Sequence, residues 1–299
     1  MPAEASHYEA LESAAERRRA IFRWILFGIL ALFALYYLIP LYVMIVTSLK
    51  DMDEIRSGNI IALPSAFNFE AWAVAWGGRG YAAGDVFLRP SFWNSIQMVV
   101  PAVVVSTFLG ALNGYALTKW RFPGSDWIFL LFLFGCFIPY QAILLPMART
   151  LGILGLSNSV NGLILVHSVY GLSFTTLFFR NYYVSIPDEI IKAAKIDGAG
   201  FFKIFFMVIL PISAPIIVVT VIWQFTNIWN DFLFGSSFSF GDSAPIQVAL
   251  NNMVLTSTSV KQYNVDMAAA IIAGLPTLIV YVLAGKYFIR GLTAGSVKG

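Results

Sequence analysis

Residues 127–179 read WIFLLFLFGCFIPYQAILLPMARTLGILGLSNSVNGLILVHSVYGLSFTTLFF and contain a single charged side chain, Arg149. The arginine separates two uncharged runs, 127–148 and 150–179. About 20 apolar residues in a helix cross the hydrocarbon core of a bilayer, and in lipid the backbone groups must pair within that helix. Each run is therefore predicted to cross a membrane, with a tight hairpin at Arg149, where Gly152 and Gly155 follow closely.

Four further uncharged runs have a similar length, so the sequence predicts an all-α polytopic membrane protein with six transmembrane helices. Of the 299 residues, 59% are hydrophobic and 12% are charged, whereas an ordinary soluble domain is about 25% charged. The net charge of +3 favours no nucleic-acid partner. The single cysteine, Cys136, leaves no metal cluster and is expected to be a small buried hydrophobic residue. The four runs are 24–49, 90–118, 204–230 and 267–285.

The distribution of basic residues indicates the orientation in the membrane. With a cytoplasmic N-terminus, 13 of the 19 lysines and arginines fall on cytoplasmic segments and 6 on outer segments. Because cytoplasmic loops are enriched in lysine and arginine, we expect a multi-pass inner-membrane protein with both termini in the cytoplasm. The cytoplasmic set is Arg17, Arg18, Arg19, Arg23, Lys119, Arg121, Arg180, Lys192, Lys195, Lys203, Lys286, Arg290 and Lys298; the outer set is Lys50, Arg56, Arg79, Arg89, Arg149 and Lys261.

Residues 1–20 are predicted to be a cytoplasmic N-terminal tail, which is either a short surface helix or a frayed segment. Ser6 and Glu9 have the spacing of a capping box, which favours a helix beginning at Ser6. The Ala-Glu-Arg composition of the tail also favours helix.

The remaining chain is divided by the same runs. Residues 21–290 are predicted to form the six-span transmembrane domain, and 291–299 a cytoplasmic C-terminal tail. Two long outer segments, 50–92 and 232–264, are expected either to fold over the mouth of this domain or to contact a partner.

The cytoplasmic loop 181–206 contains a segment typical of a short capped helix, reading SIPDEIIKAAKIDGAGFFK over 185–203. Asp188 and Glu189 complement the positive end of a helix dipole, and Gly198 can end a helix in the left-handed conformation. A lone channel needs no such element, so we expect a helix shaped to enter a groove on another protein. Its apolar contacts would come from Ile190, Ile191, Ala194 and Ile196.

This segment resembles the "EAA" loop of the permease subunits of bacterial ATP-binding-cassette importers. The family pattern is Glu-Ala-Ala, three residues, Gly, nine residues and Ile-x-Leu-Pro. Ala193, Ala194 and Gly198 match it, and the stretch 208–211, VILP, closes it. Lys192 occupies the position of the family glutamate, so a salt bridge to the ATPase is not carried over to this position. The resemblance implies that the following residues dock on an ATPase: Asp188, Glu189, Lys192, Ala193, Ala194, Asp197 and Gly198.

Further stretches resemble the second permease of the maltose-type pair of carbohydrate importers. The resemblance implies a non-catalytic permease subunit of an ATP-driven importer, which moves a carbohydrate from an extracytoplasmic binding protein to the cytoplasm by alternating access. It implies a homologous permease and two ATPase subunits as partners, besides membrane lipid. The matching stretches are MIVTSLK at 44–50, Asn94-Ser95, FIPYQAILLP at 137–146, WNDF at 229–232 and YFIRGLTAGSVKG at 287–299.

Two sequence features refine this interpretation. No Gly-x-x-x-x-Gly-Lys-Ser/Thr motif occurs, so a phosphate-binding loop is missing. No cofactor is therefore expected on this chain, and ATP and Mg²⁺ are expected on the partner subunits. Residues 245–270 resemble permeases for glucose or mannose more than those for oligosaccharides.

Aromatic and amide side chains near the outer end of the fifth run are candidates for a substrate path. Trp223, Asn227 and Asn230 share one helical face, and polar groups at membrane depth usually face a bundle interior or a water-filled path. Alternatively, the tryptophans are interfacial anchors and the amides bond neighbouring helices. The candidates are Trp223, Gln224, Asn227, Asn230 and Asp231, with Gln141 between the helix-breaking Pro139 and Pro146.

Three observations on the runs complete the interpretation. His167 is expected to be a hydrogen-bonded packing residue, because no acidic residue lies one turn away. Gly110 and Gly114 form a Gly-x-x-x-Gly signal for close helix packing. The rival function is an ATP-independent secondary transporter or channel for a small polar solute. Ion coupling would require charged residues within the runs, and Asp231 is the only carboxylate close to the interior of one.

Overall fold

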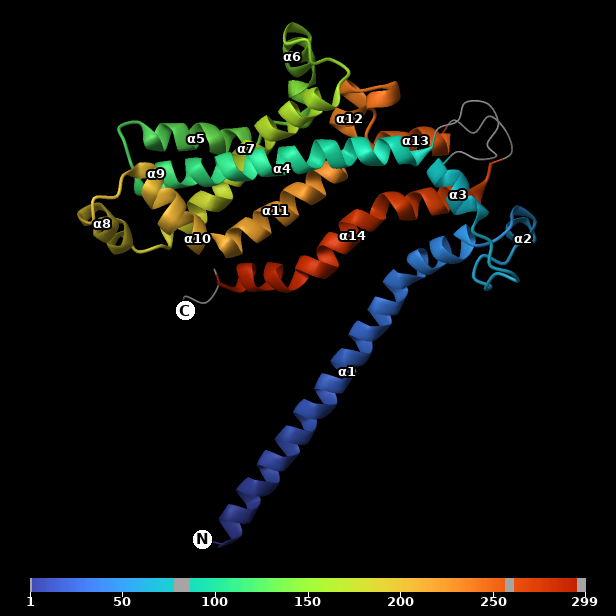
Figure 1. Ribbon diagram of the computed structural model, residues 1–299. Helices are drawn as coiled ribbons and strands as arrows, with labels where there is room; N and C mark the ends of the chain where they lie inside the picture. Colours follow the sequence, from blue (N-terminus) through green and yellow to red (C-terminus); the bar gives the residue numbers. More distant parts are fainter. Residues whose placement is uncertain (1, 78–86, 256–260, 295–299) are drawn as a thin grey trace. The chain divides into compact units, whose positions relative to one another are not determined.

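The structure is a computed structural model, and its described residues form helices and connecting turns without a strand (Figure 1). The all-α prediction is confirmed. The described backbone covers residues 2–77, 87–255 and 261–294, and side chains are described within 16–77, 87–255 and 261–285. The longer helices are α1 (Pro2–Ser48), α3 (Glu70–Gly77), α4 (Leu88–Lys119), α5 (Ser125–Gly135), α6 (Tyr140–Ile153), α7 (Val160–Val184), α8 (Asp188–Ile196), α11 (Ala214–Trp229), α13 (Ile246–Leu255) and α14 (Tyr263–Ala294). The short ones are α2 (Met52–Arg56), α9 (Phe201–Ile204), the π-helical turn η1 (Phe205–Ile209), α10 (Leu210–Ile212), α12 (Leu233–Phe238) and the 3-10 turn η2 (Gly241–Ser243).

Among the described residues, four unbroken helices are long and apolar enough to cross a bilayer. Two bent pairs of helices pass the same test together: α5 with α6, bent by 104°, and the helix Phe201–Ile212 with α11, bent by 79°. Each of the six uncharged runs lies on one of these elements, so the six-span architecture holds with each bent pair counted as one span. The unbroken spans are Glu16–Ser48, Leu88–Lys119, Val160–Val184 and Tyr263–Gly285.

The connection between the third and fourth spans differs from the predicted hairpin at Arg149. α6 runs through Arg149 to Ile153, so the arginine lies within a helix. The chain reverses further on, where Gly155 (φ 67°) and Asn158 (φ 51°) have left-handed backbone. Such φ values favour glycine and asparagine, whereas a charged side chain does not by itself create a turn. The break within the third span lies at one of the two helix-breaking prolines, Pro139, directly before α6, whereas Pro146 lies inside that helix.

α1 is a single helix of 47 residues that includes most of the predicted tail. Ser6 lies inside this helix, so the predicted capping box at Ser6 is wrong, since a cap acts only where a helix begins. Further along α1 the large apolar side chains are exposed, as for Trp24 (75%) and Leu35 (67%). An apolar helix surface of this kind suits contact with lipid or with another chain.

α1, α2 and the first residues of α14 belong to one compact unit of the chain. Within this unit Lys50 is only 2% exposed, and its ammonium group donates to the carbonyl of Asn59 at 2.9 Å. The Asn264 amide, near the start of α14, donates to the Lys50 carbonyl at 3.1 Å. Lys50 thus holds the segment after α1 through both its side chain and its backbone.

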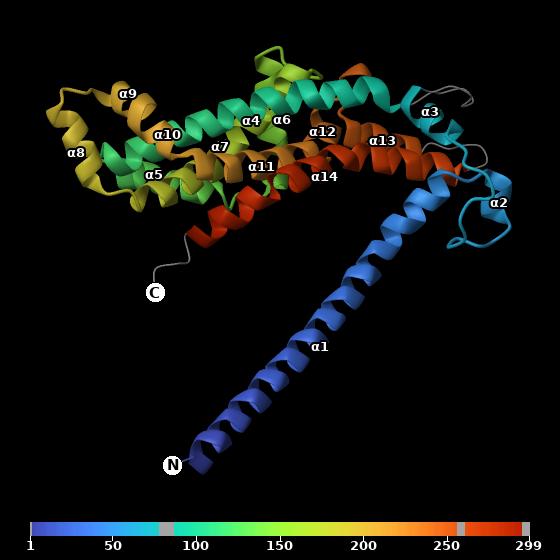
Figure 2. The same ribbon diagram turned by 60° about the horizontal axis from the view of Figure 1, so that its bottom comes forward.

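The second compact unit is built around α4 and α7, which lie side by side (Figures 1 and 2). A Cβ atom added at Gly110 would lie 2.3 Å from Thr175 Oγ1, and one at Gly114 would lie 2.8 Å from the backbone nitrogen of Arg180. Residues without a side chain allow two helix backbones to approach this closely. The predicted packing role of Gly110 and Gly114 is confirmed.

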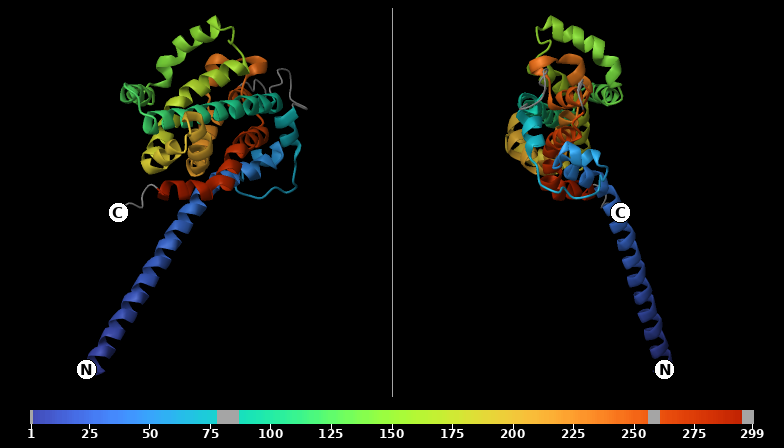
Figure 3. Two further views of the ribbon diagram at one scale, coloured as in Figure 1. Left: turned by 60° about the vertical axis from the view of Figure 1, so that its left-hand side comes forward. Right: turned by 90° about the vertical axis from the view of Figure 1, so that its right-hand side faces the viewer.

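The two ends of the α4–α7 pair carry different elements. α8 and α9 lie at one end and α12 and α13 at the other, while α6 projects from the side (Figures 1 and 3). At the α8 end, buried side chains from α4, α7, α8, α9 and η1 form one apolar cluster, and burial of such groups is the main stabilising term in folding. Its members include Tyr115, Phe179, Tyr183, Ile191, Ile204, Phe205 and Ile209.

At the 79° bend before α11, the Ser213 side chain is buried and hydrogen-bonded, whereas its neighbours Ile212 and Ala214 are exposed. Ser213 at the bend has no exposed surface. Its hydroxyl donates to the Ile209 carbonyl at 2.5 Å and lies 2.9 Å from the hydroxyl of Tyr183 on α7. The hydroxyl at the bend is thus satisfied by Ile209 of its own segment and by Tyr183, which ties the bend to α7.

Candidate functional site

A cavity of about 500 Å³ lies among α6, α7, α11 and α12, at the end of the unit away from α8. The structure brings five of the six candidate path residues together in its wall. Gln141 is the exception: it does not line the cavity and its side chain is exposed on α6, whereas its neighbour Tyr140 does line it. The five are Trp223, Gln224, Asn227, Asn230 and Asp231.

One side of the cavity is aromatic. Tyr140 of α6 and Tyr170 of α7 have ring centroids 4.3 Å apart, and both contact Phe234 of α12. Further along α7, Phe174 lies 4.8 Å from the ring of Trp223 on α11. Aromatic rings that face a cavity can stack on the apolar C–H faces of a ligand while keeping a polar edge available.

The amide side chains of α11 have different environments. Gln224 is 2% exposed and donates to Ser106 Oγ of α4 at 2.7 Å, so it links neighbouring helices. Asn227 and Asn230 are exposed, and each donates to a carbonyl of α11 one turn earlier, at 2.8 and 2.9 Å. The carbonyl oxygen of Asn230 accepts from Nε2 of Gln247 at 3.4 Å. That of Asn227 lies on an exposed side chain in the cavity wall, where it can accept a hydrogen bond from a hydroxyl group.

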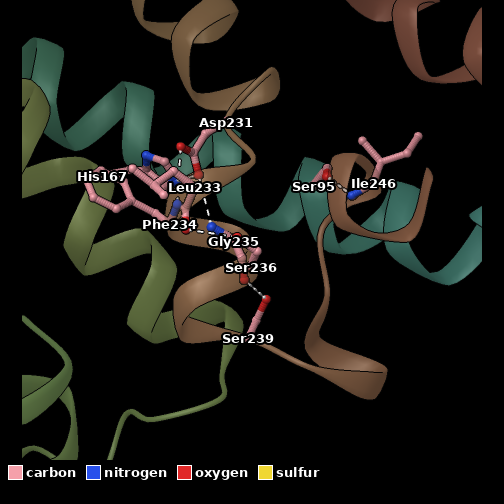
Figure 4. Close-up of polar contacts among 9 residues, drawn as sticks. All are labelled: Ser95, His167, Asp231, Leu233, Phe234, Gly235, Ser236, Ser239 and Ile246. Carbon is pink, nitrogen blue, oxygen red and sulfur yellow. Dashed lines mark hydrogen bonds and ion pairs between the residues drawn. The ribbon is translucent and has the colours of Figure 1, made fainter. Parts of the chain in front are cut away.

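Asp231 caps the short helix α12 (Figure 4). Its carboxylate accepts the backbone N–H of Gly235 at 3.0 Å and that of Phe234 at 3.4 Å. The same carboxylate lies 3.7 Å from Nε2 of His167 on α7. The predicted packing role of His167 agrees with its burial, but its Nε2 has no hydrogen-bond partner among the described residues. The acidic neighbour lies in the turn between α11 and α12, which the spacing along α7 cannot reveal.

Asp231→Ala is expected to lower the free energy of unfolding by about 1 kcal/mol, as the loss of a helix cap does. Asp231→Asn keeps an oxygen acceptor for the N–H groups of α12, and its free energy of unfolding is expected to fall by only about a few tenths of a kcal/mol. Unfolding in mixed micelles by denaturing detergent measures both values. An equal loss in the two variants would instead assign the stabilising role to the charge beside His167.

Two side chains of α4 hold the segment that leads into α13. The Asn94 amide donates to the carbonyls of Asp242 and Ala244, at 2.6 and 3.1 Å. Ser95 Oγ accepts the backbone N–H of Ile246, the first residue of α13, at 2.8 Å (Figure 4). The Asn94-Ser95 pair singled out in the sequence thus acts as an anchor for the chain beyond α12.

The other candidate site is α8, whose ends are defined as the sequence predicts. Asp188 and Glu189 lie in its first turn, and Gly198 has a φ of 75° directly after it. The Gly198 N–H donates to the Lys195 carbonyl at 3.0 Å and the Ala199 N–H to the Ala194 carbonyl at 2.9 Å. This pair of bonds is a Schellman motif, which fixes the helix end.

The two faces of α8 have different roles. Ile191 is 4% exposed, and together with Ala194 it packs on the apolar cluster of the chain itself. On the other face Ala193 is exposed, as are Ile190 (41%) and Ile196 (86%). The predicted alanine pair is therefore split, since Ala194 contacts its own chain and Ala193 faces outward. Lys192 and Asp197 are also exposed.

A buried lysine ties α8 to the end of α4. The Lys119 ammonium group donates to the Ile186 carbonyl at 2.6 Å and to Asp188 Oδ1 at 2.5 Å. These contacts lower the pKa of the Asp188 carboxyl below its ordinary value, through the hydrogen bond from Lys119 and its positive charge. The start of α8 is thereby joined to α4 as well as to α7.

The sequence missed the aromatic side of the cavity. Tyr140, Tyr170 and Phe234 come from three different elements, and aromatic residues are so frequent in this chain, at 16%, that their identity alone gives no signal. The available signal was that Tyr170 follows His167 by three residues, which places both side chains on the same face of α7.

Fold and sites together define a polytopic helical permease. Residues 102–292 match the family described as "Binding-protein-dependent transport system inner membrane component", and the chain belongs to this family. A probable ABC transporter permease protein of Pyrococcus horikoshii is 40% identical, covering 95% of this chain and 100% of that protein. The xylose/arabinose import permease protein of Haloferax volcanii is 32% identical, and the match covers 89% of this chain and 90% of that protein.

A solved structure has the same fold. A chain of a bacterial ABC transporter involved in the import of the acidic polysaccharide alginate superposes with a TM-score of 0.76 at 24% identity, covering 90% of this chain and 96% of that one. The protein described here is accordingly a multi-pass membrane permease subunit of the ATP-binding-cassette class and not an enzyme. The family resemblance seen in the α8 segment is confirmed.

Proposed function

We propose that this chain is the second permease of a carbohydrate importer, in which it pairs with a homologous permease and two ATPase subunits. An extracytoplasmic binding protein delivers the sugar, and ATP and Mg²⁺ are bound by the partner subunits. The observation that carries the proposal is the cavity lined by both aromatic rings and accessible amides. The chain belongs to the family of binding-protein-dependent transport components, and this excludes the alternative of a secondary transporter or channel that works alone.

The chemistry of the cavity supports a sugar as substrate. A sugar presents apolar C–H faces to aromatic rings and hydroxyl groups to amides, and Trp223 and Asn227 offer both on one face of α11. The single carboxylate in the wall, Asp231, already accepts two backbone N–H groups. The relative from Haloferax volcanii carries a name that refers to monosaccharides, which supports a simple sugar. The glucose or mannose preference inferred from residues 245–270 remains part of the proposal.

The opposite end of the unit supports coupling to an ATPase. α8 presents Ile190, Ala193 and Ile196 outward, and its inner face is fixed to α4 and α7 by Lys119 and the apolar cluster. A push on α8 would therefore move the helices that border the cavity. Alternating access follows if closure of the ATPase pair displaces α8 and so reorients α7 and α11.

Trp223→Ala is expected to lower sugar uptake at least about tenfold, since removal of an aromatic anchor in a binding site commonly costs more than 1.4 kcal/mol. The reconstituted transporter, tested with glucose and mannose, measures uptake and sugar-stimulated ATP hydrolysis together. Trp127→Ala is the matched control, because Trp127 is 74% exposed and lies outside the cavity. A loss of ATPase assembly that accounts for all the lost uptake would favour the packing role of Trp223 instead.

The proposed orientation places both termini and α8 in the cytoplasm. In a Cys136→Ser background, Ser57→Cys and Ser237→Cys are expected to react with a membrane-impermeant thiol reagent from outside, because both serines are exposed in predicted outer segments. Ser185→Cys, which is also exposed, is expected to react only after the membrane is permeabilised. Labelling of Ser185→Cys in intact cells would reverse the orientation.

A further inference from the structure

A second, polar pocket lies between the end of α4 and the inner side of α8. It has a volume of about 370 Å³ and is lined by Thr118, Lys119, Arg121, Asp188, Lys192 and Lys195. Four of these side chains carry a positive charge and one a negative charge, so the pocket has a net positive charge. A pocket of this charge selects an anionic group.

The pocket contains a buried hydroxyl group without a partner. Thr118 is 8% exposed, and its Oγ1 makes no hydrogen bond among the described residues. Buried polar atoms almost always have partners, and Thr118 differs from the equally unpartnered Thr107 in that it lines this charged pocket. The hydroxyl can donate to an anion while neighbouring ammonium groups neutralise it.

The neighbouring cations have donors to spare. Lys119 has a side chain only 5% exposed, and two of its three N–H groups are used, by Ile186 and Asp188. Arg121 and Lys192 are exposed, and both lie near Asp188. Lys195 is held with its ammonium group 4.0 Å above the ring of Trp120. The two charged non-ester oxygens of a phosphodiester group would match this set of a hydroxyl and several cations.

The position of the pocket identifies the source of such a group. Lys119 is the last residue of α4, a membrane-spanning helix, so the pocket lies where a span leaves the bilayer. Anionic phospholipids expose their phosphate groups at this depth, and basic pockets at cytoplasmic helix ends bind them. We propose that the pocket between α4 and α8 binds the phosphate of an anionic phospholipid of the cytoplasmic leaflet. The proposal uses the orientation given above, but does not depend on which substrate is transported.

The test measures lipid binding and not transport. The full chain, in nanodiscs of phosphatidylcholine, is titrated with phosphatidylglycerol, and bound lipid is counted by native mass spectrometry. Wild type is expected to bind phosphatidylglycerol at least about tenfold more tightly than phosphatidylcholine, from several cations each contributing about fivefold. Thr118→Val is expected to weaken the binding of phosphatidylglycerol about tenfold, because it removes one hydrogen bond to a charged group. Arg121→Gln is expected to weaken the same binding about fivefold.

Matched controls lie on the same helix and on another charged segment. Thr107 is a second buried threonine of α4 whose Oγ1 has no hydrogen-bond partner among the described residues, and it lies outside the pocket. Thr107→Val and Lys203→Gln are therefore expected to bind phosphatidylglycerol as wild type does. Helix content by circular dichroism verifies that every variant is folded.

Four results would overturn the proposal. Equal binding of the two lipids would show that the pocket is not a specific site. So would an equal loss of phosphatidylglycerol binding in Thr107→Val and Thr118→Val. Displacement of phosphatidylglycerol by millimolar inorganic phosphate would assign the pocket to a free anion. Displacement by the assembled ATPase subunits would assign it to acidic groups of that partner. None of these outcomes changes sugar uptake by Trp223→Ala, so the two proposals fail separately.

Discussion

Replacing Ala193 with aspartate is expected to abolish co-purification of the ATPase subunits with this chain. Ala193 is exposed on the outward face of α8, between Ile190 and Ile196, and makes no contribution to the apolar cluster of its own chain. In a docked complex the new carboxylate would be buried without a partner, which costs several kcal/mol. Each 1.4 kcal/mol weakens association about tenfold.

The control for this experiment is Ala193→Ser, which stays small and uncharged and is expected to retain the ATPase subunits. Co-purification from detergent and sugar-stimulated ATP hydrolysis are measured on both variants. Ala194 is less suitable for the test, because it already packs against its own chain and its carbonyl accepts the N–H of Ala199. Wild-type assembly of Ala193→Asp would show that this face of α8 does not dock.

Gly114→Leu is expected to prevent accumulation of folded protein in the membrane. Its Cβ would lie 2.8 Å from the backbone nitrogen of Arg180 and 3.0 Å from the carbonyl carbon of Phe179. Backbone atoms cannot move aside as a flexible side chain can, so α4 and α7 must separate along their contact. Overpacking of this kind costs about 1–3 kcal/mol for smaller insertions, and here it also breaks the contact on which the unit is built.

Gly274→Leu is the matched control for this prediction. A Cβ at Gly274 in α14 meets nothing within 4 Å, and leucine has the higher helix propensity. The fraction of protein that elutes as a single species in size-exclusion chromatography measures both variants. If Gly114→Leu matched Gly274→Leu, the close approach of α4 and α7 would not be required for folding.

Local signals in the sequence predicted much of the fold. The uncharged runs located the spans, because a helix in lipid needs only length and apolar composition. α8 was also predictable from local signals, because the acidic first turn and the left-handed Gly198 act on the backbone within a few residues. The turn after α6 was placed a few residues too early, because the chain reverses at Gly155, which the sequence offered, and at Asn158, and not at the charge of Arg149.

Contacts between distant residues could not be predicted. The α11 pattern predicted a polar face, and five candidates do line one cavity. It could not separate Gln224, which bonds Ser106 on α4, from Asn227, which stays accessible. Nor could it place His167 beside Asp231, because two helices must pack before the pair exists. Pairings of this kind depend on the tertiary structure and leave no periodic trace in one sequence.

The bend at Ser213 has a mechanical consequence. A flexible joint would absorb a displacement applied at α8, whereas Ser213 fixes the 79° angle through Ile209 and Tyr183. The segment Phe201–Ile212 and α11 then behave as the two arms of a rigid crank. Under the proposed coupling, a displacement of the first arm would turn the second, which carries Trp223 and Asn227. The two bonds of one buried serine would then decide how much of that displacement reaches the cavity.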